Sequence, residues 1–335
     1  MGRPSPRSQR ENRAGQRQFR RDLVQRDAAA AQRLMRAYGT VQRRIAKPLD
    51  ALNAAAQDMT SPRDLHASPA MLRLQDEVRA ALNDFSKVIE RESRGGQQAG
   101  ATIGRSAAID QLDTVATAFN RPSVETVQSL INYVDSPAFQ GALSEYGLYH
   151  AQHISDIVLT DSTMGKGVQA IVRHIRRYVD MPRADAERMV RTVTLWSARR
   201  ASQQIYQANS DIVSGWRWSA ALDRRTCISC VVQHGKVFPL NQVLNDHHQG
   251  RCAPVPLTRF TGGVKPGVEW FNDLPESEQQ QMMGRSAYRA WRDGAITLDQ
   301  LSTTHIDPVY GEMRHEASLT KIIGADAAAA YGRAA

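Results

Sequence analysis

The sequence predicts a mainly α-helical protein with one small α+β module. Aromatic residues make up only 6% of the 335 residues and alanine is abundant, which favours packed helices over a large sheet. Over most of the chain, apolar residues recur every three or four positions, which is the spacing of an amphipathic helix. The exception is residues 214–258, where strand-like alternation occurs together with a group of cysteines and histidines.

The N-terminal region carries the excess positive charge. Residues 1–50 contain thirteen arginines and lysines and four acidic residues, and the whole chain has a net charge of +9. We expect residues 1–16, rich in Arg, Ser, Pro and Gln, to form a disordered basic arm. Such an arm can contact DNA phosphates or dock on an acidic partner. The candidate contact residues are Arg10, Arg13, Arg17, Arg20 and Arg21.

Long helices are predicted for residues 17–93. The first stripe of apolar residues is Phe19, Leu23, Leu34, Tyr38, Val41, Ile45, Leu49 and Leu52. Pro48 lies inside this stripe and can kink or divide the helix. The second stripe is Leu72, Leu74, Val78, Leu82, Phe85 and Ile89.

A flexible linker is predicted over residues 94–121, because four glycines fall between Gly95 and Gly104. No Gly-Lys-Ser/Thr follows these glycines, so the segment is not a phosphate-binding loop. Residues 122–213 return to helical spacing and are expected to form a helical domain, which begins with a helix capped by Ser123.

The predicted Cys/His β module spans residues 214–258. Short strands are expected at Trp216–Ala220, at Lys236–Phe238 and around Val255. For residues 259–335 we expect short helices, the last of them from Leu298 onward, and then an alanine-rich frayed tail.

Three features of the sequence indicate the cellular compartment in which the protein functions. No apolar run reaches the 18 residues or so that a membrane helix needs, and the N-terminus has no apolar signal region. The three cysteines are an odd number and all fall within residues 227–252, which favours one local site over a disulfide framework. We therefore expect a protein of a reducing compartment that does not bind a membrane.

Cysteine and histidine spacing in the module predicts a structural zinc site. Cys227-x-x-Cys230 can present two thiolates to one ion, and Cys252 and a histidine would complete a Cys₃His shell. His248 is the first choice for that ligand, His247 is the alternative, and His234 is a third candidate.

Other roles for these cysteines remain open from the sequence. They can be packed or exposed reduced thiols, and Cys-x-x-Cys can serve redox chemistry, although the βαβ context of that use is missing. Cys227 can also be the nucleophile of a cysteine-dependent hydrolase. Asp223, four residues before Cys227, is expected to order the turn.

The same segment resembles the phage head-morphogenesis family, also called the Mu F-type minor head proteins. The resemblance rests on Gly215-Trp216-Arg217-Trp218, Asp223-x-Arg225-Thr226-Cys227-x-x-Cys230, His234-Gly235-x-x-Phe238 and the His247-to-Cys252 ending. Flanking segments extend it over about residues 160–300. Two residues depart from the family pattern: Val193 replaces a common Glu, and Gly250 replaces a further Cys, which leaves Cys252 as the ligand of that ending.

The resemblance implies a structural role in a virus particle. It implies a low-copy component of the procapsid and virion of a tailed phage, present in the host cytoplasm during assembly. Its partners would be the portal protein, the scaffold and major capsid proteins, and packaged DNA through the basic arm. We expect no enzymatic activity. The competing hypotheses are a cysteine-dependent hydrolase, a transferase-type effector, and a zinc-containing DNA-binding protein.

Overall fold

The computed structural model describes the backbone of residues 6–333 and the side chains of residues 18–332. Helices account for 64% of the chain and the strands are short and antiparallel, which confirms the predicted fold class. The chain divides into two compact units. Unit 1 comprises Met1–Leu23, Gln98–Ile131 and Leu195–Ala335, and unit 2 comprises Val24–Gln97 and Asn132–Thr194.

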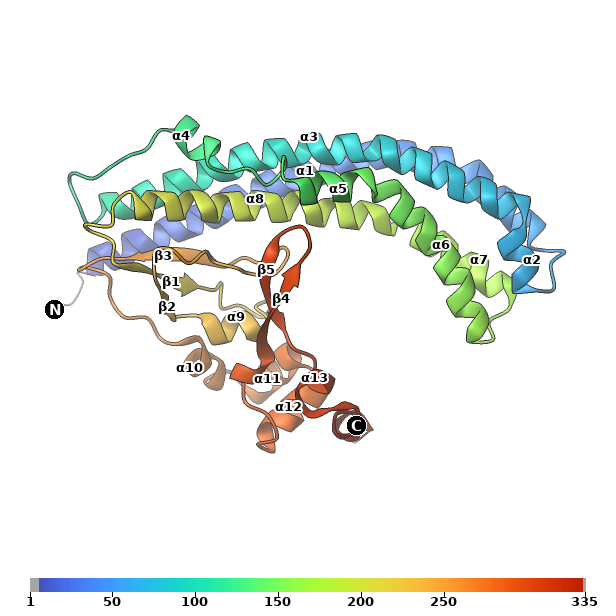
Figure 1. The fold of residues 1–335 in the computed structure, drawn as a ribbon. Coiled ribbons are helices and arrows are strands. Elements are labelled where there is room, and N and C mark those ends of the chain that lie inside the picture. The colour runs from blue at the N-terminus through green and yellow to red at the C-terminus, as the bar shows by residue number, and fades with distance from the viewer. Residues whose placement is uncertain (1–5, 334–335) are drawn as a thin grey trace. The chain divides into compact units, whose positions relative to one another are not determined.

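Unit 2 is entirely helical. It contains parts of three long helices and several shorter ones (Figure 1): α1 (Pro6–Ala55), α2 (Pro62–Ala67), α3 (Pro69–Asp113), α5 (Pro137–Ser144), α6 (Tyr146–Thr163), α7 (Val168–Tyr178) and α8 (Met181–Gln207). The predicted stripes form its core: Leu34, Tyr38, Val41, Ile45 and Leu52 of α1 are buried, as are Val78, Leu82, Phe85 and Ile89 of α3. Leu72 is the exception, because it is 55% exposed.

The predicted flexible linker is wrong over residues 94–113, since α3 continues without a break to Asp113, and only residues 114–121 of that segment lie outside the regular elements. The glycines there serve close helix packing. A Cβ on Gly96 would lie 2.4 Å from Thr194 Oγ1, and a Cβ on Gly104 would lie 1.9 Å from the carbonyl oxygen of Ala198. Both contacts are with α8, so the glycines let two backbones approach where a larger residue would collide.

The prediction of a disordered arm is also wrong from Pro6 onward, because α1 begins there and continues through Pro48. Proline suits the first turn of a helix, and the arginines and glutamines that follow are good helix formers. Residues 1–5 of the predicted arm lie outside the described residues.

The sheet of unit 1 has the order β2-β1-β3 and is antiparallel throughout. Its strands are β1 (Gly215–Ser219), β2 (Val237–Phe238) and β3 (Ala253–Leu257), close to the predicted positions. Trp216 pairs with Phe238 on one side and with Pro256 on the other, and its ring stacks on Phe238 at 4.5 Å between centroids. Trp216 and Trp218 are both buried, so the indoles anchor this small sheet.

The rest of unit 1 combines short helices with a hairpin (Figure 1). The elements are α4 (Val124–Ser129), α9 (Ile228–Gln233), α10 (Gly267–Asn272), α11 (Glu276–Met283), α12 (Arg285–Arg292), η1 (Asp299–Leu301), β4 (Ser302–Asp307), β5 (Gly311–Glu316), α13 (Leu319–Ile323) and α14 (Ala325–Arg333). Helices α9 to α14 and η1 share an apolar core, in which Ile228, Val231 and Phe271 are fully buried. No helix in the described part of the chain has the length and apolar character to cross a bilayer.

The β4–β5 hairpin corrects the predicted helix from Leu298 onward. Ser302 to Ile306 are mostly β-branched or polar residues that suit a strand. The side chain of Asp307 accepts hydrogen bonds from the backbone N–H groups of Val309 and Tyr310, and Gly311 closes the turn at φ 80°. The local turn chemistry therefore outweighs any helical tendency.

Candidate metal centre

The Cys-x-x-Cys turn is built at the start of α9. Cys227 is the N-cap residue, and its sulfur accepts a hydrogen bond from the backbone N–H of Cys230 at 3.4 Å. Asp223 orders the preceding turn, because its carboxylate accepts from the N–H of Arg225 and from the hydroxyl of Thr226. Arg251 donates to both oxygens of Asp223 at 2.6 Å, which ties this turn to the loop that carries Cys252.

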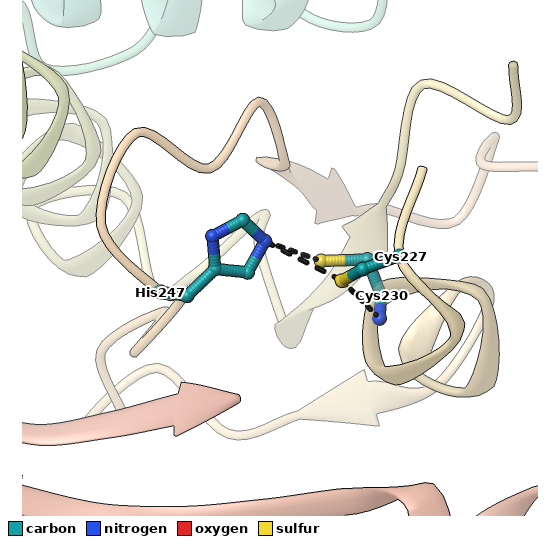
Figure 2. Close-up of side chains that lie close together, drawn as sticks. All are labelled: Cys227, Cys230 and His247. Carbon is teal, nitrogen blue, oxygen red and sulfur yellow. Dashed lines mark hydrogen bonds between the residues drawn. The ribbon is translucent and has the colours of Figure 1, made fainter. Parts of the chain in front are cut away.

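His247 completes a group of three donor atoms (Figure 2). Its Nε2 lies 3.4 Å from the sulfur of Cys227 and 3.4 Å from the sulfur of Cys230. These donor atoms all lie within 4.8 Å of one another. Sulfur and nitrogen ligands of one tetrahedral zinc ion are about 3.5 Å apart, given the usual bond lengths. The spacing therefore fits a shared ion, and it also fits S–H···N hydrogen bonds.

The tautomer of His247 suits metal binding. Its Nδ1 lies 2.8 Å from the carbonyl oxygen of His248. A carbonyl can only accept, so Nδ1 carries the proton, and the Nε2 of a neutral ring has its lone pair toward the two sulfurs. Fixing a ligating histidine through its other nitrogen is the usual outer-shell arrangement of a metal site.

Asp246 and Cys252 form a second group with Cys230, and their donor atoms also lie within 4.8 Å of one another. Oδ1 of Asp246 is 3.3 Å from the sulfur of Cys230 and 3.5 Å from Nε2 of His247. Cys230 is thus common to both groups, whereas neither Asp246 nor Cys252 belongs to the group that contains Cys227 and His247.

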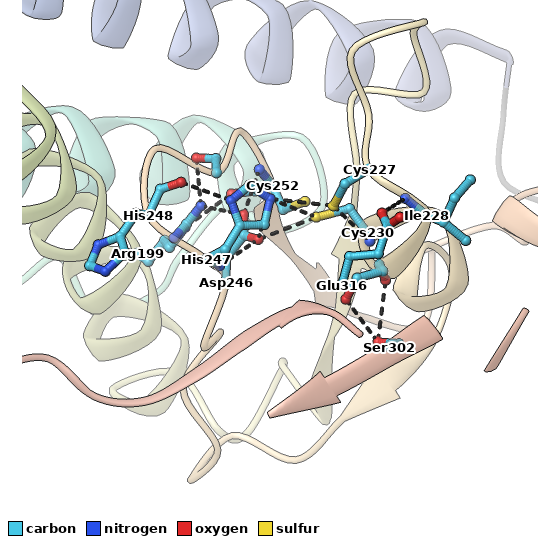
Figure 3. A network of polar contacts seen from close by, with 12 residues as sticks. Arg199, Cys227, Ile228, Cys230, Asp246, His247, His248, Cys252, Ser302 and Glu316 are labelled. Carbon is cyan, nitrogen blue, oxygen red and sulfur yellow. Dashed lines mark hydrogen bonds and ion pairs between the residues drawn. The ribbon is translucent and has the colours of Figure 1, made fainter. Parts of the chain in front are cut away.

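A fully buried ion pair connects this site to α8 (Figure 3). Arg199 of α8 donates to Oδ2 of Asp246 at 2.8 Å and to the carbonyl oxygens of Gly250 and Cys252 at 2.9 and 3.1 Å. Both side chains are at most 1% exposed. Burial alone would raise the pKa of Asp246, but the charges of Arg199 and His247 lower it, so the carboxylate stays ionised.

The electrostatics favour a thiolate at Cys227. The hydrogen bond from Cys230, together with His247, lowers the pKa of the Cys227 thiol to about 5 against the effect of burial. The same hydrogen bond, the neighbouring Cys252 and burial keep Cys230 protonated by raising its pKa well above the usual value. Burial would lower the pKa of His247, yet contact with Cys227 and the charge of Asp246 raise it to about 9. Without an ion, the site is a thiolate–imidazolium pair.

Glu316 lies beside this pair at the end of β5 (Figure 3). It accepts a hydrogen bond from the backbone N–H of Ile228 at 2.9 Å, so it caps the first turn of α9. Burial raises its pKa to about 7, with a contribution from the charge of Cys227. The hairpin is therefore attached to the Cys-x-x-Cys turn by a polar contact.

The structure brings together only part of the predicted ligand set. Cys227 and Cys230 meet His247, the alternative histidine, whereas Nε2 of His248 lies 3.3 Å from Asp307. Nδ1 of His234 accepts from the backbone N–H of Ala220, away from the thiols. Sequence reasoning missed Asp246, because the nearby Asn-Asp-His-His run gives no sign that the acidic residue is buried.

The two described arginines among the predicted DNA contacts differ in burial and in hydrogen-bond partners. Arg20 is half-buried and donates to the carbonyl oxygen of Ala220 at 3.3 Å, while Arg21 is exposed and donates to Gln18. The side chains of Arg10, Arg13 and Arg17 lie outside the described residues.

Two thiols at the start of a helix, together with a histidine oriented through its Nδ1, are typical of loops that can bind a metal ion. Residues 152–256, just under a third of the chain, match the family model of Phage Mu protein F like proteins. The match includes α8, the sheet and the whole cysteine–histidine group, and it is consistent with a phage head-morphogenesis protein. Comparisons with curated proteins and with solved structures give no significant match.

Proposed function

We propose that this chain is a structural minor head protein of a tailed bacteriophage, and that it binds the portal protein in the procapsid. The observation that carries the proposal is the family match over residues 152–256. The helical architecture supports it, because long helices offer extended surfaces for docking. Scaffold and major capsid proteins are further candidate partners.

A structural zinc ion is the second part of the proposal. The loops from Ala220 to Cys252 have little regular structure, and a metal would staple them where a small module cannot bury enough apolar surface. Cys227, Cys230 and His247 would hold the ion, with Asp246 or Cys252 as the fourth ligand. The bound ion would neutralise the thiolates and fix the start of α9.

Co-expression with the portal protein of the same phage tests the first part. We expect the two proteins to elute together in size-exclusion chromatography, and assembled virions to contain this chain by mass spectrometry. Separate elution at micromolar concentration, together with virions that lack the chain, would contradict the proposal.

Elemental analysis tests the metal. The purified protein should carry about one zinc per chain. The Cys227→Ser and His247→Gln variants should lose it, and residues 214–258 should then exchange amide hydrogens faster while the helices of unit 2 stay protected. His248→Gln is the matched control, since that ring lies beside Asp307 and the variant should keep the ion. If the wild-type protein is folded without metal and its unfolding is unaffected by chelators, the cysteines are ordinary thiols and the zinc proposal is wrong.

The pairing of Cys227 with His247 also supports a cysteine-dependent enzyme as the second candidate. A depressed thiol pKa near an imidazolium is what a nucleophilic cysteine needs. The two functions make opposite demands on the native protein. A closed zinc site protects Cys227 from alkylation, whereas a catalytic thiolate reacts rapidly. Rapid, selective alkylation of Cys227 in native protein would therefore favour the enzyme and count against the zinc site.

A further inference from the structure

Unit 1 contains a cavity of about 380 Å³ that is separate from the cysteine–histidine group. Its walls come from α1 (Arg20), from β1 (Arg217 and Trp218) and from the loop that follows β3. Trp270 of α10 forms part of the apolar wall. The volume falls in the range of small-molecule sites.

Within the part of the chain whose side chains are described, neither arginine in the wall forms an ion pair with a carboxylate. Arg217 donates to the carbonyl oxygen of Gly262 at 2.7 Å, and Arg20 donates to Ser219 and to the carbonyl oxygen of Ala220. Within residues 18–332, no carboxylate lies within ion-pair distance of either guanidinium. Asp223 is the nearby acidic residue, but Arg251 occupies both of its oxygens.

The other polar residues around the cavity do not supply negative charge. His234 stays neutral, because burial and the two arginines lower its pKa to about 4. Lys265 is already paired with Asp273. In addition, Nε of Arg20 is buried without a hydrogen-bond partner. Among residues 18–332, the cavity thus contains two guanidinium groups without a directly paired carboxylate, and one unused donor.

An anion in the cavity would stabilise both guanidinium groups. Burial lowers the pKa of both Arg20 and Arg217, which shows that the surroundings penalise their charged forms. Guanidinium groups are planar forks that match the oxygens of phosphate better than an ammonium does. A phosphate monoester or inorganic phosphate carries about two negative charges at neutral pH, which equals the charge of the two arginines. A single carboxylate would neutralise only one of them.

We propose that this cavity binds a dianionic phosphate group held between Arg20 and Arg217. The phosphate can be free inorganic phosphate or the terminal phosphate of a nucleotide. In the second case the base would lie toward Trp270, because an aromatic wall suits base stacking. None of the residues that line the cavity belongs to the candidate metal centre.

Isothermal titration calorimetry of the full-length chain tests the proposal, with inorganic phosphate as the first probe in a phosphate-free, low-salt buffer. We expect saturable binding and a higher melting temperature with phosphate present. Arg20→Gln and Arg217→Gln should each weaken binding at least tenfold. Arg21→Gln is the matched control, because the Arg21 side chain is exposed and donates to Gln18. This variant should bind phosphate as tightly as the wild type does.

Two further arms make the test specific. If Arg217→Gln does not fold, Arg217→Lys keeps the charge but loses the fork, and it should fold and bind phosphate more weakly than wild type. If a deoxynucleoside monophosphate binds more tightly than inorganic phosphate, the phosphate group that the cavity binds belongs to a nucleotide. If the two ligands bind with equal affinity, the ligand is free phosphate. The proposal would be overturned if the wild-type protein showed no saturable phosphate binding. It would also be overturned if Arg20→Gln and Arg217→Gln bound phosphate as tightly as the wild type, or if acetate bound as tightly as phosphate.

Discussion

Gly104→Ala is expected to destabilise unit 1, although alanine is the better helix former. Gly104 lies in the interior of α3, at its crossing with α8. The new Cβ would lie 1.9 Å from the carbonyl oxygen of Ala198, 2.6 Å from its carbonyl carbon and 2.7 Å from its Cα. These are backbone atoms, so no side-chain rotation can relieve the collision, and the two helices must move apart.

The size of the effect follows from opposing contributions. Replacing a helical glycine with alanine stabilises by about 1 kcal/mol through backbone entropy. Overpacking of a tight core typically costs about 1–3 kcal/mol. The hydrogen bond from the Ser202 hydroxyl to the carbonyl oxygen of Gly104, 2.9 Å long, would be stretched, at a cost of about 1 kcal/mol. We expect a net loss of about 2 kcal/mol.

Thermal and urea unfolding measure this loss, with Gly39→Ala as the matched control. A Cβ on Gly39 would meet only the end of the Arg43 side chain at 3.6 Å, so this variant should be more stable by about 0.5–1 kcal/mol. For a domain of this size, the Gly104→Ala loss corresponds to a melting temperature lower by about 4–8 °C. If Gly104→Ala is as stable as wild type, α3 and α8 do not pack as closely as described.

Two further predictions concern buried charges. His150 is 1% exposed, and burial, with smaller effects from His153 and Arg188, lowers its pKa to about 4, whereas unfolded histidine titrates near 6.5. The contribution of His150 is complete above pH 6.5 and is lost as pH falls toward 4, so its share of the unfolding free energy should decrease by about 2.5 kcal/mol between pH 7 and 4.5. His150→Gln should reduce the measured pH dependence by about this amount, whereas His153→Gln, at a side chain that is 44% exposed, should leave it unchanged. Arg199→Met leaves the Asp246 carboxylate buried and unpaired, so urea unfolding should show a loss of about 3–5 kcal/mol; a loss under about 1 kcal/mol would mean that water reaches Asp246.

The sequence was sufficient for the helices whose apolar stripes face a core. Leu34, Tyr38, Val41 and Ile45 are spaced as a helix requires and are all buried. It failed where the meaning of a residue depends on a distant partner. The glycines of 94–121 indicate flexibility when read alone, but their role is set by Thr194 and Ala198, about a hundred residues later. The hairpin after Leu301 was missed because its strands are short and half-exposed.

The sequence indicated which residue types gather at the candidate metal centre, but not which histidine faces the thiols. The spacing of Cys227 and Cys230 places both sulfurs at one helix start, and that is a local property. Which of His247 and His248 faces them depends on the backbone of the loop, where Gln249 adopts a left-handed conformation with φ 58°. No periodicity indicates such a turn, so adjacent histidines cannot be ranked from sequence.

Asp246 shows why the scaffold and the candidate site have to be considered together. One of its oxygens is engaged by Arg199 of α8, and the other faces Cys230 and His247. If that second oxygen binds an ion, Arg199 acts as an outer-shell residue that orients the carboxylate, because it fixes the far side of the same group. If Cys252 binds instead, Asp246 orders the loop through the backbone N–H groups of His247 and Cys252. In both cases the buried carboxylate requires Arg199, so the position of the loop that carries the candidate ligands depends on a helix that no Cys/His pattern in the sequence would reveal.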